Sequence, residues 1–293
     1  MKKIVFLGCE NSHSAMFINF IKGDEKYNDI EILGVYSHDE TAAKTLGEKC
    51  GVPVMKSYDE AVGKVDGVVI TARHGDNHYK YAKPYIEKGV TMFIDKPITI
   101  NEEESISFMQ ECKKAGAQIT GGSCLRFDAW VSEIAKDNES EAGGKTLGGY
   151  VRCPISLGNP NGGFFFYAQH LVETVQVAFG RNVKSVYAKK SGKTLQVLFH
   201  YDNYTVSGTF VDESYNSYYV ARLTENEVKG KEFTVDGKNP CFKAEWDEFY
   251  NILSGGEQVA SYQDFIAPVF VMNAIARSME SGKEEKICYR EVE

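Results

Sequence analysis

A lysine directly after a short apolar run is the residue of this sequence best suited to chemistry. The segment from Val90 to Ile94 is apolar enough for a buried strand of a parallel sheet, and Asp95, Lys96 and Pro97 follow it. Because proline lacks the N–H that a sheet ladder uses, the strand must end before Pro97. Lys96 is therefore predicted at the carboxyl edge of a sheet, where open α/β sheets bind their ligands.

A histidine inside an apolar segment is the second candidate. Residues 164–179 predict a largely buried helix, and His170 lies within it. Imidazole has a pKa near neutral pH, so it can both accept and release a proton. A histidine in such a helix is more often a hydrogen-bonded core residue, and the pattern alone leaves both interpretations open.

The turn after the first predicted strand, residues 3–8, departs from the usual dinucleotide fingerprint. In that fingerprint, G-x-G-x-x-G, backbone amides at a helix N-terminus hold a pyrophosphate. Only the first glycine is present, because Glu10 and His13 stand at the other two positions. A carboxylate that pointed inward would repel phosphate. Two alternatives therefore stay open: the turn binds a dinucleotide, or it has lost that ability. The predicted cofactor-binding residues of this turn are Gly8, Glu10, Asn11, Ser12 and His13.

The ends of the later strands supply further candidates. An acid at the end of the second strand commonly bonds the ribose diol of NAD. Ser37 and His38 occupy that place, and His38 could face the additional phosphate of NADP, so both NAD and NADP remain open. The loop after residues 65–71 is another such end, although His78 has a packing role as its alternative. The predicted cofactor contacts at these ends are Ser37, His38, Thr71, Ala72, Arg73, His78, Asp95 and Lys96.

Strands and helices alternate at short spacing over residues 1–122. This alternation predicts right-handed crossovers in an α/β fold, a Rossmann-type doubly wound parallel sheet that binds a dinucleotide. The predicted strands are residues 3–8, 30–36, 65–71, 90–94 and 118–121. The predicted helices are residues 12–21, 39–50, 77–88 and 102–114.

The pattern changes near residue 125. Residues 123–293 predict a substrate-binding and dimerisation α+β domain with a mostly antiparallel sheet, whose last helices pack back on the first domain. The predicted strands are residues 149–156, 183–189, 194–201, 204–211, 215–223, 231–235 and 287–289. The predicted helices are residues 130–135, 164–179, 242–253 and 262–279, and residues 137–149 are predicted as a surface loop.

Aromatic side chains are frequent on these strands. A large exposed aromatic surface is unusual on a monomer, so we predict a homodimer or homotetramer through the sheet. The alternative is that the aromatic residues cover the two C-terminal helices. The residues concerned are Tyr187, Phe199, Tyr201, Tyr204, Phe210, Tyr218 and Tyr219.

Composition restricts the class of partner. The 33 basic and 41 acidic residues give a net charge of −8, which argues against nucleic acid or an anionic membrane as a partner. Seven cysteines in an odd, widely spaced set without Cys-x-x-Cys predict free thiols in a reducing cytoplasm. We therefore expect a cytoplasmic protein with a small-molecule substrate and no metal site.

Taken together, these motifs resemble the Gfo/Idh/MocA family of nicotinamide-dependent sugar and polyol oxidoreductases. The succession of residues 65–71, His78 and residues 89–98 is similar to the family's strand, loop histidine, helix and Glu-Lys-Pro motif. Residues 115–122 and the Arg126–Phe127 pair are similar to the family's next strand and its Arg-Phe pair, and the segment from His170 to Glu173 resembles the histidine helix of its second domain. The resemblance extends over most of the chain.

The resemblance implies an NAD(P)-dependent oxidoreductase. Hydride would pass between the nicotinamide and a hydroxyl or keto group of a small carbohydrate-like substrate. Lys96 would polarise the reacting oxygen, and His170 would act as the acid and base. The family often has a cis peptide bond before the proline of its motif, here Pro97. The implied substrate-binding residues are Arg126, Phe166, Tyr167 and His170.

Three positions depart from the family pattern. Asp95 replaces glutamate before the lysine, Glu10 replaces a glycine, and Phe166 stands where the family often has an aspartate one turn before its histidine. A phenyl ring cannot bond a sugar hydroxyl. These departures leave two alternatives: a non-catalytic, small-molecule-binding or cofactor-deficient member of the fold, and a redox-neutral lyase or epimerase that uses bound NAD.

Overall fold

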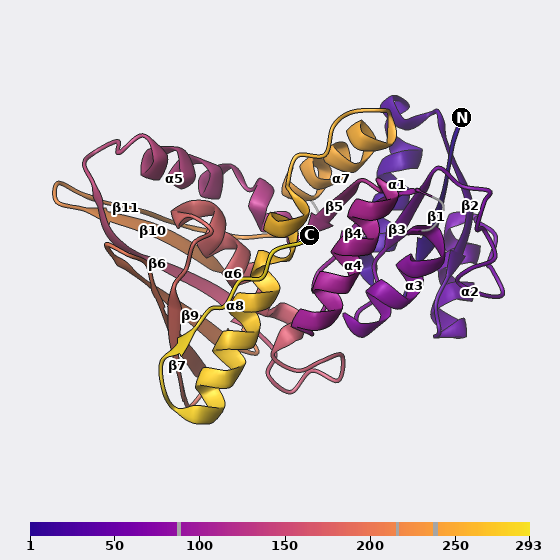
Figure 1. Ribbon diagram of the computed structural model, residues 1–293. Coiled ribbons are helices and arrows are strands. Elements are labelled where there is room, and N and C mark those ends of the chain that lie inside the picture. Colours follow the sequence, from indigo (N-terminus) through magenta and orange to yellow (C-terminus); the bar gives the residue numbers. More distant parts are fainter. Residues whose placement is uncertain (87–88, 215–216, 237–239) are drawn as a thin grey trace. The chain divides into compact units, whose positions relative to one another are not determined.

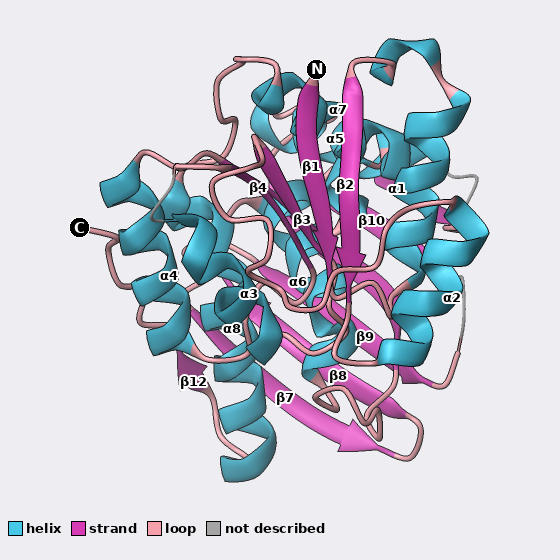
Figure 2. Cartoon of the chain, turned by 90° about the vertical axis from the view of Figure 1, so that its right-hand side faces the viewer, coloured by secondary structure: helices cyan, strands magenta, loops and turns pink. Residues whose placement is uncertain are grey.

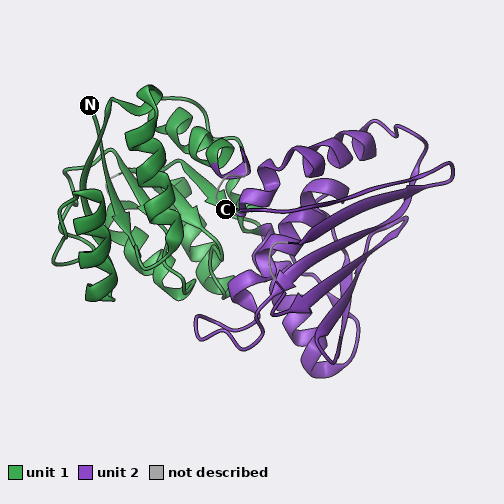
Figure 3. Cartoon of the chain, turned by 180° about the vertical axis from the view of Figure 1, so that it is seen from behind, with its two compact units in different colours: residues 1–122, 243–266, 291–293 green, residues 123–242, 267–290 purple. Residues whose placement is uncertain are grey.

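The computed structural model describes residues 1–86, 89–214, 217–236 and 240–293 (Figure 1). Contacts divide the chain into two compact units (Figure 3). Unit 1 comprises residues 1–122, 243–266 and 291–293, and unit 2 comprises residues 123–242 and 267–290. Each unit therefore combines segments that are distant in the sequence.

A parallel sheet of five strands forms the centre of unit 1, with the order β2–β1–β3–β4–β5. The strands are β1 (Lys2–Leu7), β2 (Ile30–Tyr36), β3 (Gly67–Ile70), β4 (Thr91–Asp95) and β5 (Ile119–Gly122). The chain winds outward from β1 to β2 and then returns to the other side of β1 for β3. Ligands of doubly wound sheets bind at the carboxyl ends of the strands beside this reversal. The predicted α/β fold class is confirmed.

Four helices connect these strands: α1 (Ser12–Gly23), α2 (Glu40–Cys50), α3 (Asp76–Ile86) and α4 (Glu102–Ala115), with a 3₁₀ turn, η1 (Glu25–Tyr27), after α1. Figure 2 shows α3 and α4 side by side. The side chains of Asn11, Asp39 and Asn101 accept backbone N–H groups at the starts of α1, α2 and α4, as their residue types predict. Gly51 and Gly116 end α2 and α4 in the left-handed conformation, with φ of 59° and 70°.

A late segment completes the core of unit 1. Helix α7 (Pro240–Leu253) contains Trp246, which is fully buried. Its ring stacks on Phe17 at 5.1 Å and on Phe6 at 6.2 Å between centroids. Phe249, one turn later, meets the edge of Phe93 at 6.0 Å. Burial of each aromatic side chain contributes about 2–3 kcal/mol, so the face of the sheet under α7 depends on residues far along the chain.

Unit 2 is built on a seven-stranded sheet with the order β11–β10–β6–β9–β8–β7–β12. Every neighbouring pair is antiparallel except β6 and β9, which run parallel. The strands are β6 (Thr146–Ile155), β7 (Ser185–Ser191), β8 (Thr194–His200), β9 (Thr205–Asp212), β10 (Tyr218–Thr224), β11 (Val228–Phe233) and β12 (Glu285–Lys286). The helical elements are η2 (Cys124–Phe127), α5 (Ala129–Glu139), α6 (Phe165–Phe179) and α8 (Tyr262–Ser281), of which residues 267–281 belong to unit 2.

Three predictions about the second half of the chain are wrong in detail. The predicted loop at residues 137–149 is shorter and covers residues 140–145, because α5 extends to Glu139 and β6 starts at Thr146. The predicted last strand, residues 287–289, lies after β12, because pairing ends where β12 meets the first residue of β7, Ser185. The predicted aromatic face is split, since the side chains of Phe199, Phe210 and Tyr218 are buried while the other four are partly exposed. The predicted helix end at residues 87–88 and strand start at residues 215–216 lie outside the described residues.

The cysteines, the helices and the possible metal-ligating side chains add three observations. All seven cysteines are free thiols, and Cys288 is the exposed one. Within the described ranges, no helix is both long and apolar enough to cross a membrane. No group of three or more histidine, cysteine, aspartate or glutamate side chains in those ranges is arranged to hold a metal ion.

Candidate cofactor and catalytic residues

The first loop of unit 1 is packed tightly against the loop after β3. Gly8 has φ of +78°, and a Cβ at this position would lie 2.4 Å from the Cα of Ala72. The Thr71 hydroxyl donates to the Gly8 carbonyl at 3.2 Å and lies 2.6 Å from the hydroxyl of Ser14. Gly8 is therefore required by the close approach of two strand ends, in the left-handed region where glycine is favoured.

The Glu10 side chain contacts residues after β2 and after β3, beside the point where the strand order reverses. One carboxylate oxygen accepts the Ser37 hydroxyl at the end of β2, at 2.6 Å, and the other accepts the backbone N–H of Arg73 after β3, at 3.0 Å. Both donors are neutral. The Glu10 carboxylate thus accepts hydrogen bonds from donors that could otherwise bind an anionic ligand. Glu10, Ser37 and Arg73, all predicted site residues, are therefore in contact.

Asp95 is the centre of a buried group at the end of β4. Its carboxylate lies 2.7 Å from Nδ1 of His13 and accepts the side-chain amide of Asn11 at 3.1 Å. Burial by itself would raise the pKa of Asp95, but the His13 imidazole and the Lys96 cation outweigh burial and hold that pKa below its usual value. Asp95 also accepts the backbone N–H of Lys96, at 2.8 Å, which fixes the first peptide after the strand.

Lys96 follows directly, and its residue is almost wholly buried at 4% exposure. The peptide bond between Lys96 and Pro97 is cis, as the family resemblance implies. The lysine lies where the sequence predicts it, at the carboxyl edge of the parallel sheet, one strand away from the reversal.

His78 is fully buried in the first turn of α3. Its Nε2 lies 2.8 Å from the Ala72 carbonyl and therefore carries the proton of that hydrogen bond. Burial lowers the pKa of His78, and this outweighs the opposite effect of the Ala72 carbonyl. His78 thus holds the loop that contains Ala72 through this hydrogen bond, which agrees with the packing role considered for it.

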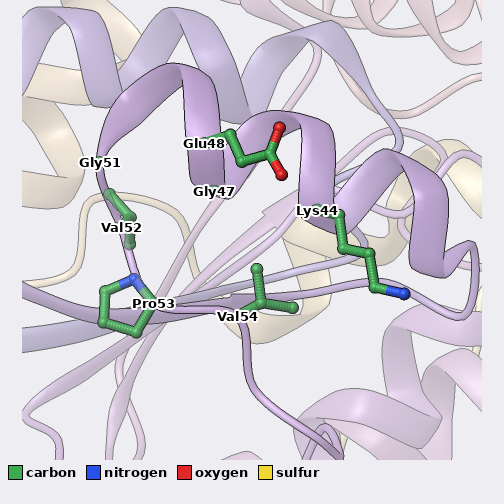
Figure 4. Close-up of a pocket in the computed structure, with 7 residues that line it drawn as sticks. All are labelled: Lys44, Gly47, Glu48, Gly51, Val52, Pro53 and Val54. Atoms are coloured by element: carbon green, nitrogen blue, oxygen red, sulfur yellow. The ribbon is translucent and has the colours of Figure 1, made fainter.

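A pocket of about 460 Å³ lies at the end of β2 and the start of α2. Ser37 and His38 line it together with the cationic side chains of Lys44 and Lys56, and Glu40 is the acid among its lining residues. A second pocket of about 410 Å³ lies further along α2 and is lined by residues 44–54 of that region (Figure 4). The second pocket contains none of the predicted site residues, whereas Ser37 and His38 line the first.

His170 lies on α6 in unit 2, within a buried polar cluster. Its Nδ1 is 2.6 Å from the hydroxyl of Ser123, which lies just after β5. Glu173 accepts the backbone N–H of Ser123 and, at 3.2 Å, the side-chain amide of Gln169. Burial raises the pKa of Glu173, although the Arg126 guanidinium opposes this. The bond to Ser123 agrees with the interpretation of His170 as a hydrogen-bonded residue, and the catalytic interpretation stays a prediction.

The other predicted substrate-binding residues lie near this cluster in the chain. The Tyr167 ring lies 5.5 Å from the His170 ring and 5.0 Å from the Phe166 ring. Arg126 places its guanidinium over the Phe127 ring at 4.5 Å. Ser123 was not among the predicted site residues. Ser123 follows the carboxyl end of a strand, and this position could have marked it as a candidate site residue.

Residues 2–123 match the sequence model of the family described as an oxidoreductase family with an NAD-binding Rossmann fold. Uncharacterized oxidoreductase YhhX of Escherichia coli is 26% identical over 133 residues, 42% of this chain and 38% of that protein. D-xylose 1-dehydrogenase (NADP(+)) 2 of Haloferax volcanii is 24% identical over 116 residues, 39% of this chain and 35% of that protein. These alignments span little more than a third of either relative.

The structural comparison extends over the whole chain. Scyllo-inositol dehydrogenase from Lactobacillus casei, solved with NAD(H) and scyllo-inositol, gives a TM-score of 0.83 at 13% identity, with 98% of this chain and 99% of that chain covered. At this identity the likeness establishes the fold, including that of the second half.

The family match and the fold agree with the resemblance noted in the sequence. The match supports a nicotinamide dinucleotide as the ligand of this part of the chain. The matched segment ends at residue 123 and includes every predicted cofactor-binding residue. The amino-terminal part of the chain, residues 2–123, is therefore similar to the NAD-binding Rossmann fold of the Gfo/Idh/MocA oxidoreductases.

Proposed function

We propose that this protein is an NAD(P)-dependent oxidoreductase that transfers hydride between nicotinamide and a hydroxyl or keto group of a small carbohydrate-like substrate. The observation that carries the proposal is Lys96, buried at the carboxyl edge of a sheet whose sequence matches an NAD-binding family. The names of relatives that act on xylose and inositol support the substrate class. The exact sugar or polyol is left to experiment.

The residues of unit 1 suit the adenosine end of a dinucleotide more clearly than its pyrophosphate. The pocket at the end of β2 offers Ser37, His38 and two lysines to the adenosine end, a set that favours the additional phosphate of NADP over NAD. The N-terminus of α1, capped by Asn11, suits a pyrophosphate by its amides and its dipole. The carboxylate of Glu10 opposes phosphate there.

In the proposed mechanism, each residue has one task. The cofactor, when bound, would supply the hydride chemistry of the reaction. Lys96 donates a hydrogen bond from its ammonium group to the substrate oxygen and stabilises the negative charge that develops on it. His170 accepts the proton of the hydroxyl during oxidation, or returns it during reduction, so that one hydride and one proton move in each turnover.

Two measurements test this proposal. Titration of the protein with NADH and with NADPH by calorimetry should give saturable heat with at least one of them. Oxidation of the bound reduced cofactor should then be measured with a panel of keto-inositols and keto sugars. Lys96→Ala should lower kcat/KM by roughly 100-fold or more while the cofactor Kd changes less than about threefold.

A second lysine substitution serves as the control for Lys96→Ala. Lys113→Ala, on α4, removes an ammonium that bonds only the Val292 carbonyl among its described contacts, and should leave both quantities unchanged. An undiminished rate in Lys96→Ala would remove Lys96 from the mechanism. The absence of heat with either dinucleotide at millimolar concentration would contradict the enzyme proposal.

The position of Glu10 favours one alternative, a member of the fold that binds a small molecule without a dinucleotide. Its carboxylate already occupies donors at the reversal of the sheet. A redox-neutral lyase or epimerase that retains bound NAD is the other alternative, and it would show cofactor binding without net formation of reduced cofactor. The same titration and panel therefore separate all three.

A further inference from the structure

Two departures from the expected sequence pattern, His13 and Asp95, are in direct contact at the end of β4. His13 stands at the third glycine position of the dinucleotide fingerprint, and Asp95 is the shorter acid before Lys96. Nδ1 of His13 lies 2.7 Å from Oδ2 of Asp95, although 82 positions separate the two residues in the sequence. Both belong to unit 1. The histidine and the aspartate therefore form one pair in the fold.

The charge of Asp95 sets the direction of this hydrogen bond. Asp95 is almost wholly buried, and burial alone would raise its pKa. The His13 imidazole and the Lys96 cation outweigh burial, so that the pKa of Asp95 is lowered. Asp95 is therefore an ionised carboxylate, which only accepts hydrogen bonds. Nδ1 of His13 must carry the proton that it donates.

The two oxygens of the Asp95 carboxylate have different partners. Oδ2 lies against Nδ1 of His13 and accepts the side-chain amide of Asn11 at 3.1 Å, so these two partners come from the start of α1. Oδ1 accepts the backbone N–H of Lys96 at 2.8 Å. Because Pro97 has no N–H, the Lys96 N–H is the donor nearest to the end of β4. A carboxylate held through one oxygen thus fixes the peptide of Lys96 through the other.

The length of Asp95 suits the imidazole beside it. A glutamate would carry its carboxylate one methylene farther from β4, whereas the aspartate carboxylate already touches the ring of His13 at 2.7 Å. The longer acid would therefore need space that the imidazole fills. A small residue at position 13 would leave that space free. The two departures are complementary in size as well as in charge.

We propose that His13 and Asp95 are a matched pair of positioning residues, through which the start of α1 holds the backbone of Lys96 at the edge of the sheet. This role rests on the proposed oxidoreductase function and deepens it, because it gives His13 a task toward Lys96. Catalytic groups must be held within about 0.5 Å of their productive geometry. Loosening of the Lys96 peptide should therefore lower turnover more than cofactor affinity.

Hydrogen exchange of a single amide tests the positioning without cofactor or substrate. The full-length protein is labelled with ¹⁵N-lysine, and the Lys96 signal is identified by its loss in Lys96→Arg. His13→Ala removes the donor and should speed exchange of the Lys96 amide about tenfold or more. His13→Asn, whose side-chain amide can still donate, should stay within about threefold of the wild type. The amide of Lys113, on α4, reports global opening and should keep its wild-type rate.

An exchange of sizes tests whether the two residues are a pair. Asp95→Glu alone should also speed exchange at Lys96, because the imidazole occupies the space that the longer acid needs. The double variant His13→Ala/Asp95→Glu should exchange more slowly at Lys96 than either single variant. Additive effects of the two substitutions would overturn the pairing. An unchanged Lys96 rate in folded His13→Ala, or an equal acceleration at Lys113, would overturn the positioning role.

A measurement on the wild type decides the matter if His13→Ala does not fold. With ¹⁵N-histidine labelling, long-range ¹H–¹⁵N spectra at about pH 8, above the usual histidine pKa, show which ring nitrogens carry protons. The His13 signals are identified by their loss in His13→Asn. We expect a proton on Nδ1, because the Asp95 carboxylate can only accept. An unprotonated Nδ1 would overturn the proposal.

Turnover separates this proposal from the function on which it rests. With a substrate found in the panel, His13→Ala should lower kcat about tenfold while the cofactor Kd changes less than about threefold, and His13→Asn should restore most of the loss. If no dinucleotide binds, the oxidoreductase function fails while the exchange result stands. If turnover is found but His13→Ala leaves the exchange of Lys96 unchanged, only the positioning proposal fails.

Discussion

The two carboxylates at the carboxyl edge of the parallel sheet differ in how their charge is compensated. Asp95 is buried beside the imidazole of His13, whereas Glu10 is bonded to a hydroxyl and a backbone N–H, which are neutral. A phosphate brought to the start of α1 therefore meets a negative charge from Glu10 more than from Asp95. Dinucleotide affinity should depend most strongly on this one departure from the glycine fingerprint.

Replacement of Glu10 tests that inference. Glu10→Gly restores the glycine of the fingerprint and removes the repulsion, so we expect the affinity for NADH or NADPH to rise about tenfold or more. Glu10→Gln removes the charge but keeps the size, and should give part of the gain. The Kd is measured by calorimetry at low and high salt. Weaker binding by Glu10→Gly would show instead that the carboxylate serves the cofactor, for example by bonding a ribose.

His78 makes stability depend on pH. Its pKa is lowered in the folded state by burial, so the unfolded chain binds the extra proton first as the pH falls. Stability is therefore complete above about pH 6.5 and is lost as the pH falls below that value, by up to about 1.4 kcal/mol per pH unit. Melting temperatures between pH 7.5 and 5 should fall more steeply for the wild type than for His78→Gln. The exposed His38→Gln serves as the control and should keep the wild-type slope; equal slopes in all three proteins would contradict the prediction.

At the scale of single residues, the sequence was most informative where a side chain follows directly from a strand end. Lys96, Asp95 and Ser37 lie where their strands predict them. The destination of the Glu10 carboxylate could not be predicted, because it depends on the distance between the ends of β2 and β3. Ser123 was missed for a related reason: its bond to His170 joins residues 47 positions apart.

At the scale of elements, Gly8 is the position where backbone geometry restricts the site most. A methyl group would meet the backbone of Ala72, and the positive φ adds strain. Gly8→Ala should therefore lower the free energy of unfolding by about 2 kcal/mol or more, measured by urea denaturation. Gly23→Ala is the matched control, since nothing lies within 4 Å of its added methyl at the end of α1 and alanine favours helix. Equal effects of the two substitutions would show that the close approach is not limiting.

Element ends were predictable where a cap or a stop residue marks them. Asn101 and Gly116 bound α4 as expected, and β2 coincides with its predicted range, Ile30–Tyr36. The start of β6 was not predictable, because its glycines suggest a loop. Gly149 is needed within the strand: a Cβ there would lie 2.2 Å from the ring of Phe179 on α6. The same residue type thus marks a turn in one place and close packing in another, and only tertiary contacts distinguish them.

At the scale of the whole molecule, unit 2 has a sheet face on which mixed side chains are partly exposed. A row of residues crosses neighbouring strands on this face: Tyr187, Leu198, Ser207, Tyr150 and Ala221 pair in register from β7 to β10. The rings of Tyr150 and Tyr219 lie 5.9 Å apart on the same face. We propose that a second copy of the chain covers this face in a homodimer or homotetramer.

Light scattering tests the assembly. The wild type at micromolar concentration should show at least twice the mass of 32.7 kDa. Tyr219→Lys, which places a charge in the covered face, should shift the mass towards the monomer. Lys229→Glu, on the edge strand β11, is a charge change outside the row and should leave the mass unchanged. A monomeric wild type would contradict the assembly, and the aromatic side chains would then be ordinary surface residues.

The burial of Trp246 also bears on the order in which the protein forms on the ribosome. The strands of unit 1 are complete once Gly122 has been made, yet the ring that stacks on Phe6 and Phe17 is added more than a hundred residues later. At a typical 5–20 residues per second, the nascent sheet waits roughly ten seconds with these rings uncovered. The amino-terminal segment therefore cannot mature as an independent first domain during synthesis, and chaperones that shield apolar surface have their longest opportunity in that interval.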